Sequence, residues 1–386
     1  MNTRVLSTIH DVTAAEWDRL VGDDDPFVEH AFLSTLEDSG SVGGESGWQP
    51  RHLTLWEEER LVGAAPMYRK THSYGEFIFD WAWADAAART GIEYFPKLVS
   101  MVPVTPATGR RLLWAPEQDR AVVCEHLMNA SVDLAREEGA SSVHWLFLRD
   151  EELALTVESQ GFMRRLSQQF HWHNDGYSDF DDYLRSFRSS MRKQVRRERR
   201  RALGAGLELG VDTGKELSEA DWQALYVMYR VGCARYGSPD YLTEKFFVLA
   251  KERLAHRIVV ATARRDGEIV AASIAFEKGA CLFGRYWGCL EDLDCMHFEL
   301  CYYRLIERAI TKGMSRFEAG AQGEHKLRRG MLPTAIHSLH WIDDERLRGA
   351  VADFLPREAF MHLKRMDSYR EHGPFRRDQC EEPGGS

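Results

Sequence analysis

A short run after a predicted strand combines four kinds of group that can do chemistry. Residues 323–326 supply a glycine, a carboxylate, an imidazole and a primary amine in succession. The strand predicted before them covers residues 315–320, and ligands of α/β proteins usually bind where strands end. Glu324 or His325 could accept a proton from a substrate at such a place. The alternative for this run is a capped turn with exposed charges.

A second feature is a predicted basic helix over residues 181–203. Apolar side chains recur in it at helical spacing and form one stripe, so the cations fall on the outer face. These cations are Arg185, Arg188, Arg192, Lys193, Arg196, Arg197, Arg199, Arg200 and Arg201. Their mutual repulsion favours an anionic partner, and we expect Arg192, Arg196 and Arg199 to bind phosphate groups. The alternative is a solvated face balanced by the acidic remainder of the chain.

A carboxylate also stands within an aromatic, apolar stretch at residues 76–84. We predict a strand here, in which alternation places Asp80 on the face opposite Trp83. An Asp in such surroundings needs a partner or a purpose. It could act as a base or orient a bound amine, or it could simply pair with Arg69 or Arg285.

Further candidates come from a strand predicted over residues 280–288. We expect two aromatic side chains of this strand to line a cleft between two domains, although aromatic residues on a strand are more often core. The candidate substrate-binding residues outside the basic helix are Trp83, Arg285, Tyr286, Trp287 and Arg328. His171 and His173 share one strand face but have no evident third ligand, so we expect no metal site.

Bulk composition limits the classes of protein that fit. The chain has 386 residues, enough for two or three domains, and a net charge of −10, which argues against a nonspecific nucleic-acid binder. It has no apolar segment near the ~20 residues that cross a bilayer and no apolar leader, so we expect no membrane insertion. Seven cysteines without a C-x-x-C pair indicate reduced thiols and a cytoplasmic protein.

The pattern of predicted elements indicates an α/β protein with mixed sheets. Each half has the order strand, turn, strand, strand, helix, strand, and the two halves echo each other. We therefore predict an N-terminal unit over residues 1–176 and a C-terminal unit over residues 177–372. Residues 373–386 are predicted to be a disordered tail.

Four blocks of sequence, in this order, carry a resemblance to a known family. They are residues 47–86, RKQVRRERR at 192–200, residues 283–313, and FEAGAQGEHKLRRGMLP at 317–333. The chain resembles the FemAB-like family of peptidoglycan biosynthesis or recognition, within the GNAT acyltransferase superfamily. The resemblance implies two tandem GNAT-like units and N-acyl transfer, with aminoacyl-tRNA as the donor. It also implies that Lys326 stabilises charge on the transferred ester or its leaving oxygen.

The expected reaction is direct attack of an acceptor amine, on a small molecule or cell-wall precursor, without an acyl-enzyme or bound cofactor. Glu324, His325 or Asp80 would remove the proton of the amine. An alternative donor is acyl-CoA or an acyl carrier protein. Residues 289–294 argue against CoA, because they hold three acids where a glycine-rich pyrophosphate loop would stand. A third possibility is a non-catalytic protein that binds nucleotide-linked glycans.

Overall fold

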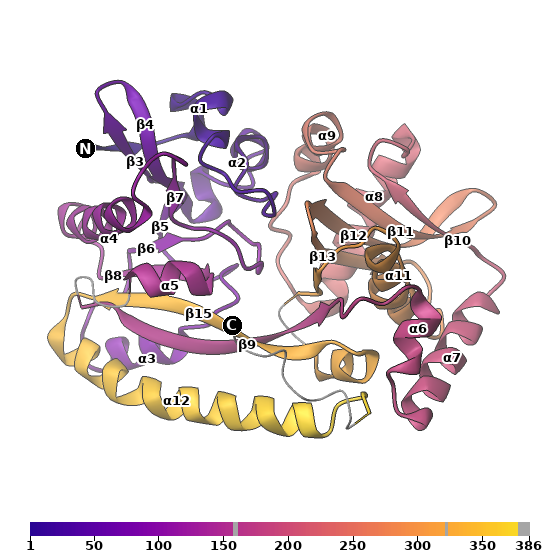
Figure 1. Cartoon of the computed structure of the whole chain (residues 1–386). Helices are drawn as coiled ribbons and strands as arrows, with labels where there is room; N and C mark the ends of the chain where they lie inside the picture. The colour runs from indigo at the N-terminus through magenta and orange to yellow at the C-terminus, as the bar shows by residue number, and fades with distance from the viewer. Residues whose placement is uncertain (157–160, 321–322, 377–386) are drawn as a thin grey trace. The chain divides into compact units, whose positions relative to one another are not determined.

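A computed structural model describes residues 1–156, 161–320 and 323–376 (Figure 1). The chain divides into two compact units. Unit 1 consists of Met1–Ser167, Tyr241–Arg253 and Ala335–Leu363, and unit 2 consists of Gln168–Asp240, Leu254–Thr334 and the chain from Lys364 onward. The chain therefore crosses between the units several times, whereas the sequence predicted one boundary near residue 176. Of the tail expected to be disordered, residues 377–386 lie outside the described part.

Unit 1 contains two groups of strands. One has the order β1 (Asn2–Leu6), β3 (His52–Glu57), β4 (Arg60–Ala65) and β7 (Leu113–Trp114). The other has the order β2 (Trp48–Pro50), β5 (Met67–Lys70), β6 (Lys97–Ser100), β8 (Ser142–Leu148) and β15 (Leu332–Ile342). Its helices are η1 (Ile9–Asp11), α1 (Ala14–Asp18), α2 (His30–Asp38), η2 (Gly44–Ser46), α3 (Trp81–Arg89), α4 (Arg120–Glu137), α5 (Asp150–Thr156) and α9 (Glu244–Arg253). Helix α4 packs against both groups and joins their apolar side chains in one core.

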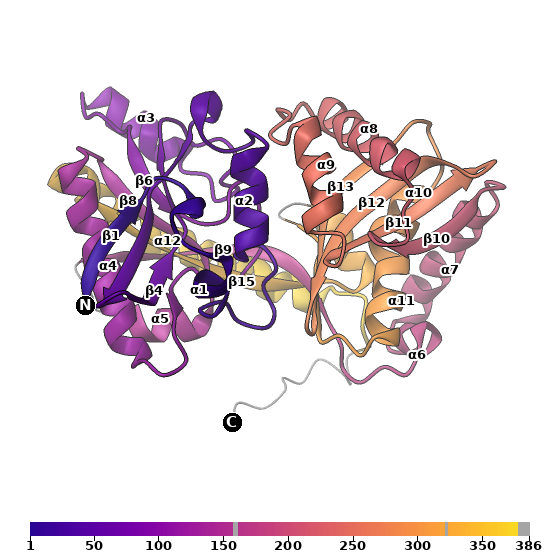
Figure 2. The ribbon, with the colours of Figure 1, turned by 90° about the horizontal axis from the view of Figure 1, so that it is seen from above.

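Unit 2 is built on one group of strands with helices on both faces. The strand order is β10 (Glu208–Thr213), β11 (Ile258–Arg265), β12 (Glu268–Lys278), β13 (Cys281–Cys289), β14 (Arg316–Glu318) and β9 (Met163–His173). Its helices are α6 (Phe180–Arg185), α7 (Ser189–Leu203), α8 (Glu219–Tyr236), α10 (Met296–Phe298), the π-helix η3 (Glu299–Tyr303), α11 (Arg304–Thr311) and η4 (Glu324–Arg329). Helix α8 covers one face of the central strands and α11 the other (Figure 2). The long helix α12 (Glu345–Glu371) begins in unit 1 and ends in unit 2.

The units exchange their last strands. Strand β9 follows β8 in the chain, yet its C-terminal half pairs with β14 in unit 2. Strand β15 follows β14 in the same way, and its C-terminal half pairs with β8 in unit 1. This exchange is why no single boundary divides the chain.

The expected order of a GNAT-like unit is confirmed in unit 2, where β11, β12 and β13 are followed by helices and then by β14, parallel to β13. In unit 1 the third strand of that order was placed wrongly. Residues 81–89 form helix α3, because this alanine-rich segment buries Trp83 and Ala87 one helical turn apart. Strand β6 takes the third position, pairing with β5 on one side and with β8 on the other.

The basic segment forms two helices in place of one over residues 181–203. The chain breaks between α6 and α7, where Phe187 forms a β-bridge with Phe375. The backbone N–H of Arg188 donates to the carbonyl of Pro374, which adds a second contact to this bridge. Residues 374–376 are therefore part of the packed fold, although the sequence assigned them to a disordered tail. Within the described residues, no helix has the length and apolar composition needed to cross a membrane.

Two glycines let α8 lie directly on β13. A Cβ added at Gly288 would lie 2.0 Å from the carbonyl oxygen of Met228, and one at Gly232 would lie 2.1 Å from that of Trp287. Both obstacles are backbone atoms, so neither can swing aside. This close approach fixes the strand that carries Arg285, Tyr286 and Trp287.

We predict that Gly288→Ala lowers the free energy of unfolding by about 1–3 kcal/mol, because the methyl group overpacks this contact. Gly349→Ala is the matched control, since nothing lies within 4 Å of an added Cβ there. That exchange lies in α12 and should stabilise the helix by about 0.5–1 kcal/mol. Chemical denaturation of both variants gives the comparison, and an equal response of the two would contradict the packing argument.

Candidate active site

Lys326 is a buried amine in unit 2 without an acidic partner. It lies in η4, with 3% of the residue exposed, and its Nζ donates to the carbonyl oxygen of Gly320 at 2.8 Å. Among the described residues, no carboxylate forms an ion pair with it. Burial lowers the pKa of Lys326 to about 7. Perturbed groups of this kind cluster at functional sites, because they are costly to keep elsewhere.

The two neighbours expected to act as bases are both exposed and both have tyrosine partners. The carboxylate of Glu324 accepts a hydrogen bond from the hydroxyl of Tyr369. His325 Nε2 lies 2.9 Å from the hydroxyl of Tyr302. Burial and the nearby Arg329 lower the pKa of His325 below its usual range, so the imidazole is neutral near pH 7 and can accept a proton.

A second imidazole, which the sequence did not single out, completes a cluster of rings. The ring of His297 lies 5.3 Å from that of Trp287, 5.4 Å from Tyr302 and 5.7 Å from His325, centroid to centroid. Burial and the neighbouring His325 lower the pKa of His297 to about 3. His297 is therefore an uncharged part of the site wall. Trp287 belongs to the same cluster as the predicted His325.

Arg285 and Tyr286 lie where two strands separate. Strands β13 and β14 run parallel for three residue pairs, the last of which joins Phe283 and Glu318. A β-bulge follows in β13, and Arg285 is its extra residue. The ring of Tyr286 packs 5.0 Å from that of Tyr229 on α8. Bulges redirect side chains and are frequent beside active sites, so this part of unit 2 suits a substrate.

The cations of the basic segment differ in their partners. Four form ion pairs with acids, namely Arg185, Arg196, Arg199 and Arg201. Arg188 and Arg200 donate to backbone carbonyls. Within the described residues, Arg192, Lys193 and Arg197 make no ion pair, and they lie on adjacent turns of α7. The free cations of the helix are thus these three, and only Arg192 was among the three expected to bind phosphate.

Arg199 is the most firmly held of the expected phosphate binders. It donates to Glu299 at 3.1 Å and to Glu307 at 2.9 Å. Glu299 is fully buried in the π-helix that follows β13 and also accepts from Arg304. Arg199 therefore fastens α7 to the core of unit 2. Arg196 is exposed and shares its charge with Asp181 at 3.1 Å.

The acidic loop after β13 is neutralised by arginines. Glu291 pairs with Arg265, and Asp292 lies 2.7 Å from Arg235. Asp294 lies 3.2 Å from Arg201 of the basic segment. The repulsion of a pyrophosphate by these acids is therefore weaker than the sequence implied. The loop nevertheless offers no free cation of its own.

Asp80 lies in unit 1, in a buried network of charges. It precedes helix α3, and its partners are the ammonium of Lys97 and the hydroxyl of Tyr94 at 2.6 Å. Lys97 also donates to Glu76 and to Ser73, each at 2.8 Å. Burial alone would raise the pKa of Asp80, but Lys97 lowers it below its usual range. The pairing considered for Asp80 exists, with Lys97 in place of Arg69 or Arg285.

Trp83 also belongs to unit 1 and packs on a buried pair of histidines. Its ring lies 4.8 Å from that of His340, and the Nδ1 atoms of His144 and His340 are 2.6 Å apart. Burial holds the pKa of His144 at about 3, so this pair is neutral. Asp80 and Trp83 thus form a structural cluster in unit 1, whereas Lys326, Glu324, His325 and Arg328 belong to unit 2.

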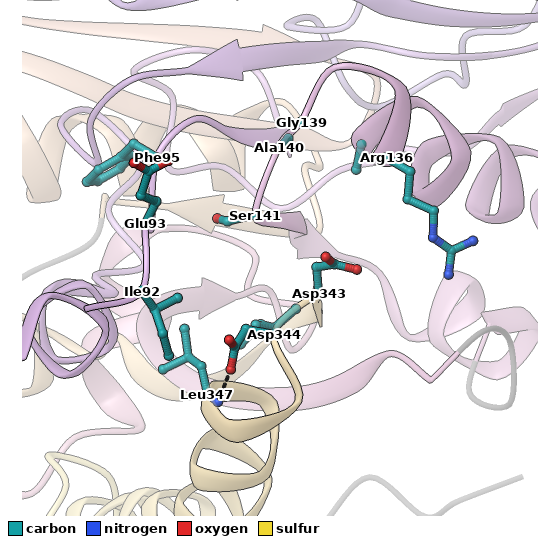
Figure 3. A pocket seen from close by; sticks show the side chains of 12 residues that line it. Ile92, Glu93, Phe95, Arg136, Gly139, Ala140, Ser141, Asp343, Asp344 and Leu347 are labelled. Atoms are coloured by element: carbon teal, nitrogen blue, oxygen red, sulfur yellow. Dashed lines mark hydrogen bonds between the residues drawn. The ribbon is translucent and has the colours of Figure 1, made fainter. Parts of the chain in front are cut away.

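A cavity of about 280 Å³ lies in unit 1 (Figure 3). Phe95, Arg136, Ser141 and Asp343 contribute to its wall, and Asp344 caps the first turn of α12 beside it. No residue predicted from the sequence to act in catalysis or binding lines this cavity. Among the described residues, no cluster of three or more His, Cys, Asp or Glu side chains could hold a metal ion.

Sequence reasoning missed a buried ion pair that holds the segment of Lys326. Arg329 in η4 donates from Nη2 to both oxygens of Glu198 in α7, each at 3.0 Å. Its guanidinium also lies 3.3 Å from the ring centroid of Phe298. One signal was present, because Glu198 is the only acid in a helix of many cations.

We predict that Lys97→Met lowers the free energy of unfolding by about 3–5 kcal/mol, because it leaves Asp80 buried without an ion-pair partner and Glu76 with Lys70 alone. The control is Arg89→Met, which breaks the exposed pair with Asp85 and should cost about 0.5 kcal/mol or less. Urea titration monitored by tryptophan fluorescence measures both. If both variants lost similar amounts of unfolding free energy, the buried ion pairs of Lys97 would contribute no more to stability than an exposed pair.

We predict that Lys326→Met stabilises the protein most at low pH. The folded pKa of Lys326 is about 7, below the ordinary 10.5, so the folded wild type buries a charge below pH 7. Between pH 7 and 10.5 the unfolded chain binds the extra proton, so wild-type stability rises with pH. The advantage of the variant should therefore shrink from pH 6 to pH 9, by at most about 1.4 kcal/mol for each pH unit above 7. Lys193→Met, an exposed control, should show no such trend.

Comparisons with known proteins extend these observations. The profile of the FemAB-like family, described as peptidoglycan biosynthesis/recognition, matches residues 8–377. No curated protein matches the sequence significantly. Solved structures with the same fold include FemX, at 11% identity and a TM-score of 0.53, covering 91% of this chain and 100% of FemX. The C-terminal domain of a putative lysylphosphatidylglycerol synthetase from Agrobacterium fabrum has 10% identity and a TM-score of 0.53, covering 89% of this chain and 96% of that one.

A conserved protein of unknown function from Bacteroides thetaiotaomicron also shares the fold, at 10% identity and a TM-score of 0.53, covering 88% of this chain and 99% of that one. At these identities the likeness concerns the fold. The family match and this fold together support an enzyme of the N-acyltransferase class. The chain belongs to the FemAB-like family of peptidoglycan biosynthesis/recognition.

Proposed function

We propose that unit 2 transfers an aminoacyl group from aminoacyl-tRNA to an amine of a small molecule or cell-wall precursor. The amine attacks the ester carbonyl, an amide bond forms, and the ester bond to the tRNA breaks. The proton of the amine passes to a base of the site, and the leaving oxygen of the tRNA takes up a proton. The reaction needs no acyl-enzyme and would take place in the cytoplasm, where charged tRNA is made.

The observation that carries this proposal is the buried Lys326 without a carboxylate. In unit 1 the buried Lys97 forms ion pairs with Asp80 and Glu76, so its charge is neutralised within the fold. The charge of Lys326 is instead free to stabilise the oxyanion that develops on the ester. Donors in a dry site act more strongly than donors in water, which suits a buried ammonium.

A base for the amine is available in the same segment. The neutral His325 can hold a lone pair on Nδ1 when its Nε2–H donates to Tyr302. Glu324 is the second candidate, although its carboxylate already accepts from Tyr369. Asp80 is less suited to this role, because Lys97 stabilises its charged form and it belongs to unit 1.

The free cations of α7 support a donor with a phosphate backbone. Arg192, Lys193 and Arg197 lie on adjacent turns of α7, and no acid of the described chain forms an ion pair with them. By contrast, the loop after β13 has its charges paired, and Glu299 in the next helix holds Arg199 and Arg304. These pairings leave few cations for the pyrophosphate of CoA at that position. An acyl carrier protein would also fit a cationic face, so the experiment includes it.

The test is binding of the purified protein to charged tRNA, uncharged tRNA, acetyl-CoA and an acyl carrier protein at two salt concentrations. We predict salt-dependent binding of tRNA that is lost when Arg192, Lys193 and Arg197 are all changed to Glu. If each of the three contacts one phosphate, the slope of log Kd against log salt should become shallower by roughly 2–3 in charge-neutral variants.

A matched control changes three exposed lysines outside α7 to Glu, namely Lys215, Lys245 and Lys312. It alters the net charge equally and should keep most of the tRNA affinity. Tight acetyl-CoA binding that ignores the α7 changes, with no binding of tRNA, would replace aminoacyl-tRNA by acyl-CoA as the donor. Binding of the carrier protein alone would make that protein the donor.

A further inference from the structure

Glu198 is an acidic residue within α7, a helix whose other charged residues are all cations. It is the single acidic residue of α7, and it lies on the buried side of the helix with 8% of its surface exposed. Its carboxylate accepts from Gln194 at 2.8 Å and from the hydroxyl of Tyr303. The two bonds from Arg329 complete its shell of donors. The charged face of α7 therefore has a buried anchor on its opposite side.

Arg329 connects this anchor to the segment that carries Lys326. Its Nη1 donates to the backbone carbonyl of His325 at 2.6 Å, which is part of the peptide group that enters Lys326. The carbonyl of Arg329 itself accepts from the hydroxyl of Tyr183 at 2.8 Å. Gly330 permits this contact, because a Cβ there would meet that hydroxyl at 1.7 Å. The last turn of η4 is thus fixed by one arginine and its partners.

We propose that Glu198 and Arg329 are positioning residues, which hold Lys326 in register with the cationic face of α7. The proposal rests on the proposed function, in that the face binds the phosphates of the donor and Lys326 acts on its ester. An ester presented by a bound donor can meet Lys326 only if helix and segment keep one relative position. Nη2 of Arg329 donates to Glu198 in the helix and Nη1 to the carbonyl of His325 in the segment, so one planar guanidinium fixes both.

An ion pair suits this task better than an apolar contact would. Buried ion pairs often add little stability compared with well-packed apolar residues, but they fix which groups face each other. The side chains of Arg329 and Glu198 are 4% and 10% exposed, so both charges are largely removed from water. The energy of such a buried pair depends strongly on its geometry. Its replacement by apolar residues should therefore separate positioning from stability.

The first measurement is the acetylation rate of Lys326 with N-hydroxysuccinimidyl acetate, followed by mass spectrometry of peptides. We expect the double variant Glu198→Leu/Arg329→Met to keep a cooperative unfolding transition while Lys326 reacts at least tenfold faster. The matched control is Glu277→Leu/Arg308→Met, which removes a bidentate pair elsewhere in unit 2 with both bonds at 2.9 Å. Its Lys326 should react at the wild-type rate.

Arg329→Lys is the second variant, and it keeps the charge but loses the planar guanidinium that holds Glu198 and the carbonyl of His325 together. We expect an intermediate rise in labelling, and this variant decides the matter if the double variant does not fold. Unchanged labelling of Lys326 in folded Arg329→Lys and in the folded double variant would overturn the positioning role. So would equal acceleration in the Glu277/Arg308 control, because the effect would then be general loosening.

Binding of tRNA, measured beside labelling, separates this inference from the proposed function. We expect Glu198→Gln to bind tRNA within twofold of the wild type while aminoacyl transfer, followed as deacylation of charged tRNA by added amine, falls at least tenfold in kcat. Faster labelling in a protein that binds no tRNA would refute the donor and leave the positioning role standing. Tight tRNA binding with unchanged labelling and unchanged kcat would refute the positioning role and leave tRNA standing as the donor.

Discussion

The constraint on which both units depend is the handling of charge removed from water. Lys97 in unit 1 is surrounded by Asp80, Glu76 and Ser73, so its ammonium is balanced inside the fold. Arg329 in unit 2 is balanced by Glu198 in the same way. Lys326 lies beside Arg329 in the chain but has a carbonyl as its hydrogen-bond acceptor. The contrast between compensated and uncompensated buried cations is what distinguishes a structural network from a site.

The exchange of strands explains how one chain holds such a site in place. Because β9 belongs by sequence to the first repeat and pairs with β14, unit 2 cannot complete its strands from its own repeat alone. The same holds for β15 and β8 in unit 1. These pairings join residues far apart in the chain, which slows folding. Segment η4 follows β14, which belongs to unit 2, and precedes β15, whose C-terminal half belongs to unit 1.

The sequence predicted features that depend on local periodicity, and missed those that depend on distant partners. The burial of apolar side chains along the basic segment, such as Leu184 and Val195, and the order of strands in unit 2 follow from local spacing, and the structure confirms them. Residues 76–84 fit alternation and helix equally well on that scale, and only the burial of Trp83 with Ala87 decides for α3. At Pro66 the chain leaves one group of strands, which contains β4, and enters the other, which contains β5. This change likewise depends on which strands are nearby.

The basic helix also combines features set by local sequence with features set by distant partners, and the distant partners decide which of its cations can bind a donor. Charge density along residues 185–201 indicates anion binding, but it treats Arg192 and Arg199 as equivalent. Their difference comes from Glu299 and Glu307, which are about a hundred residues away in the chain and occupy Arg199. A cation held by a buried carboxylate gains little from a phosphate, because it must give up an equal contact first. The residues that remain free, together with the buried acid that anchors the helix, define the face that a donor can use.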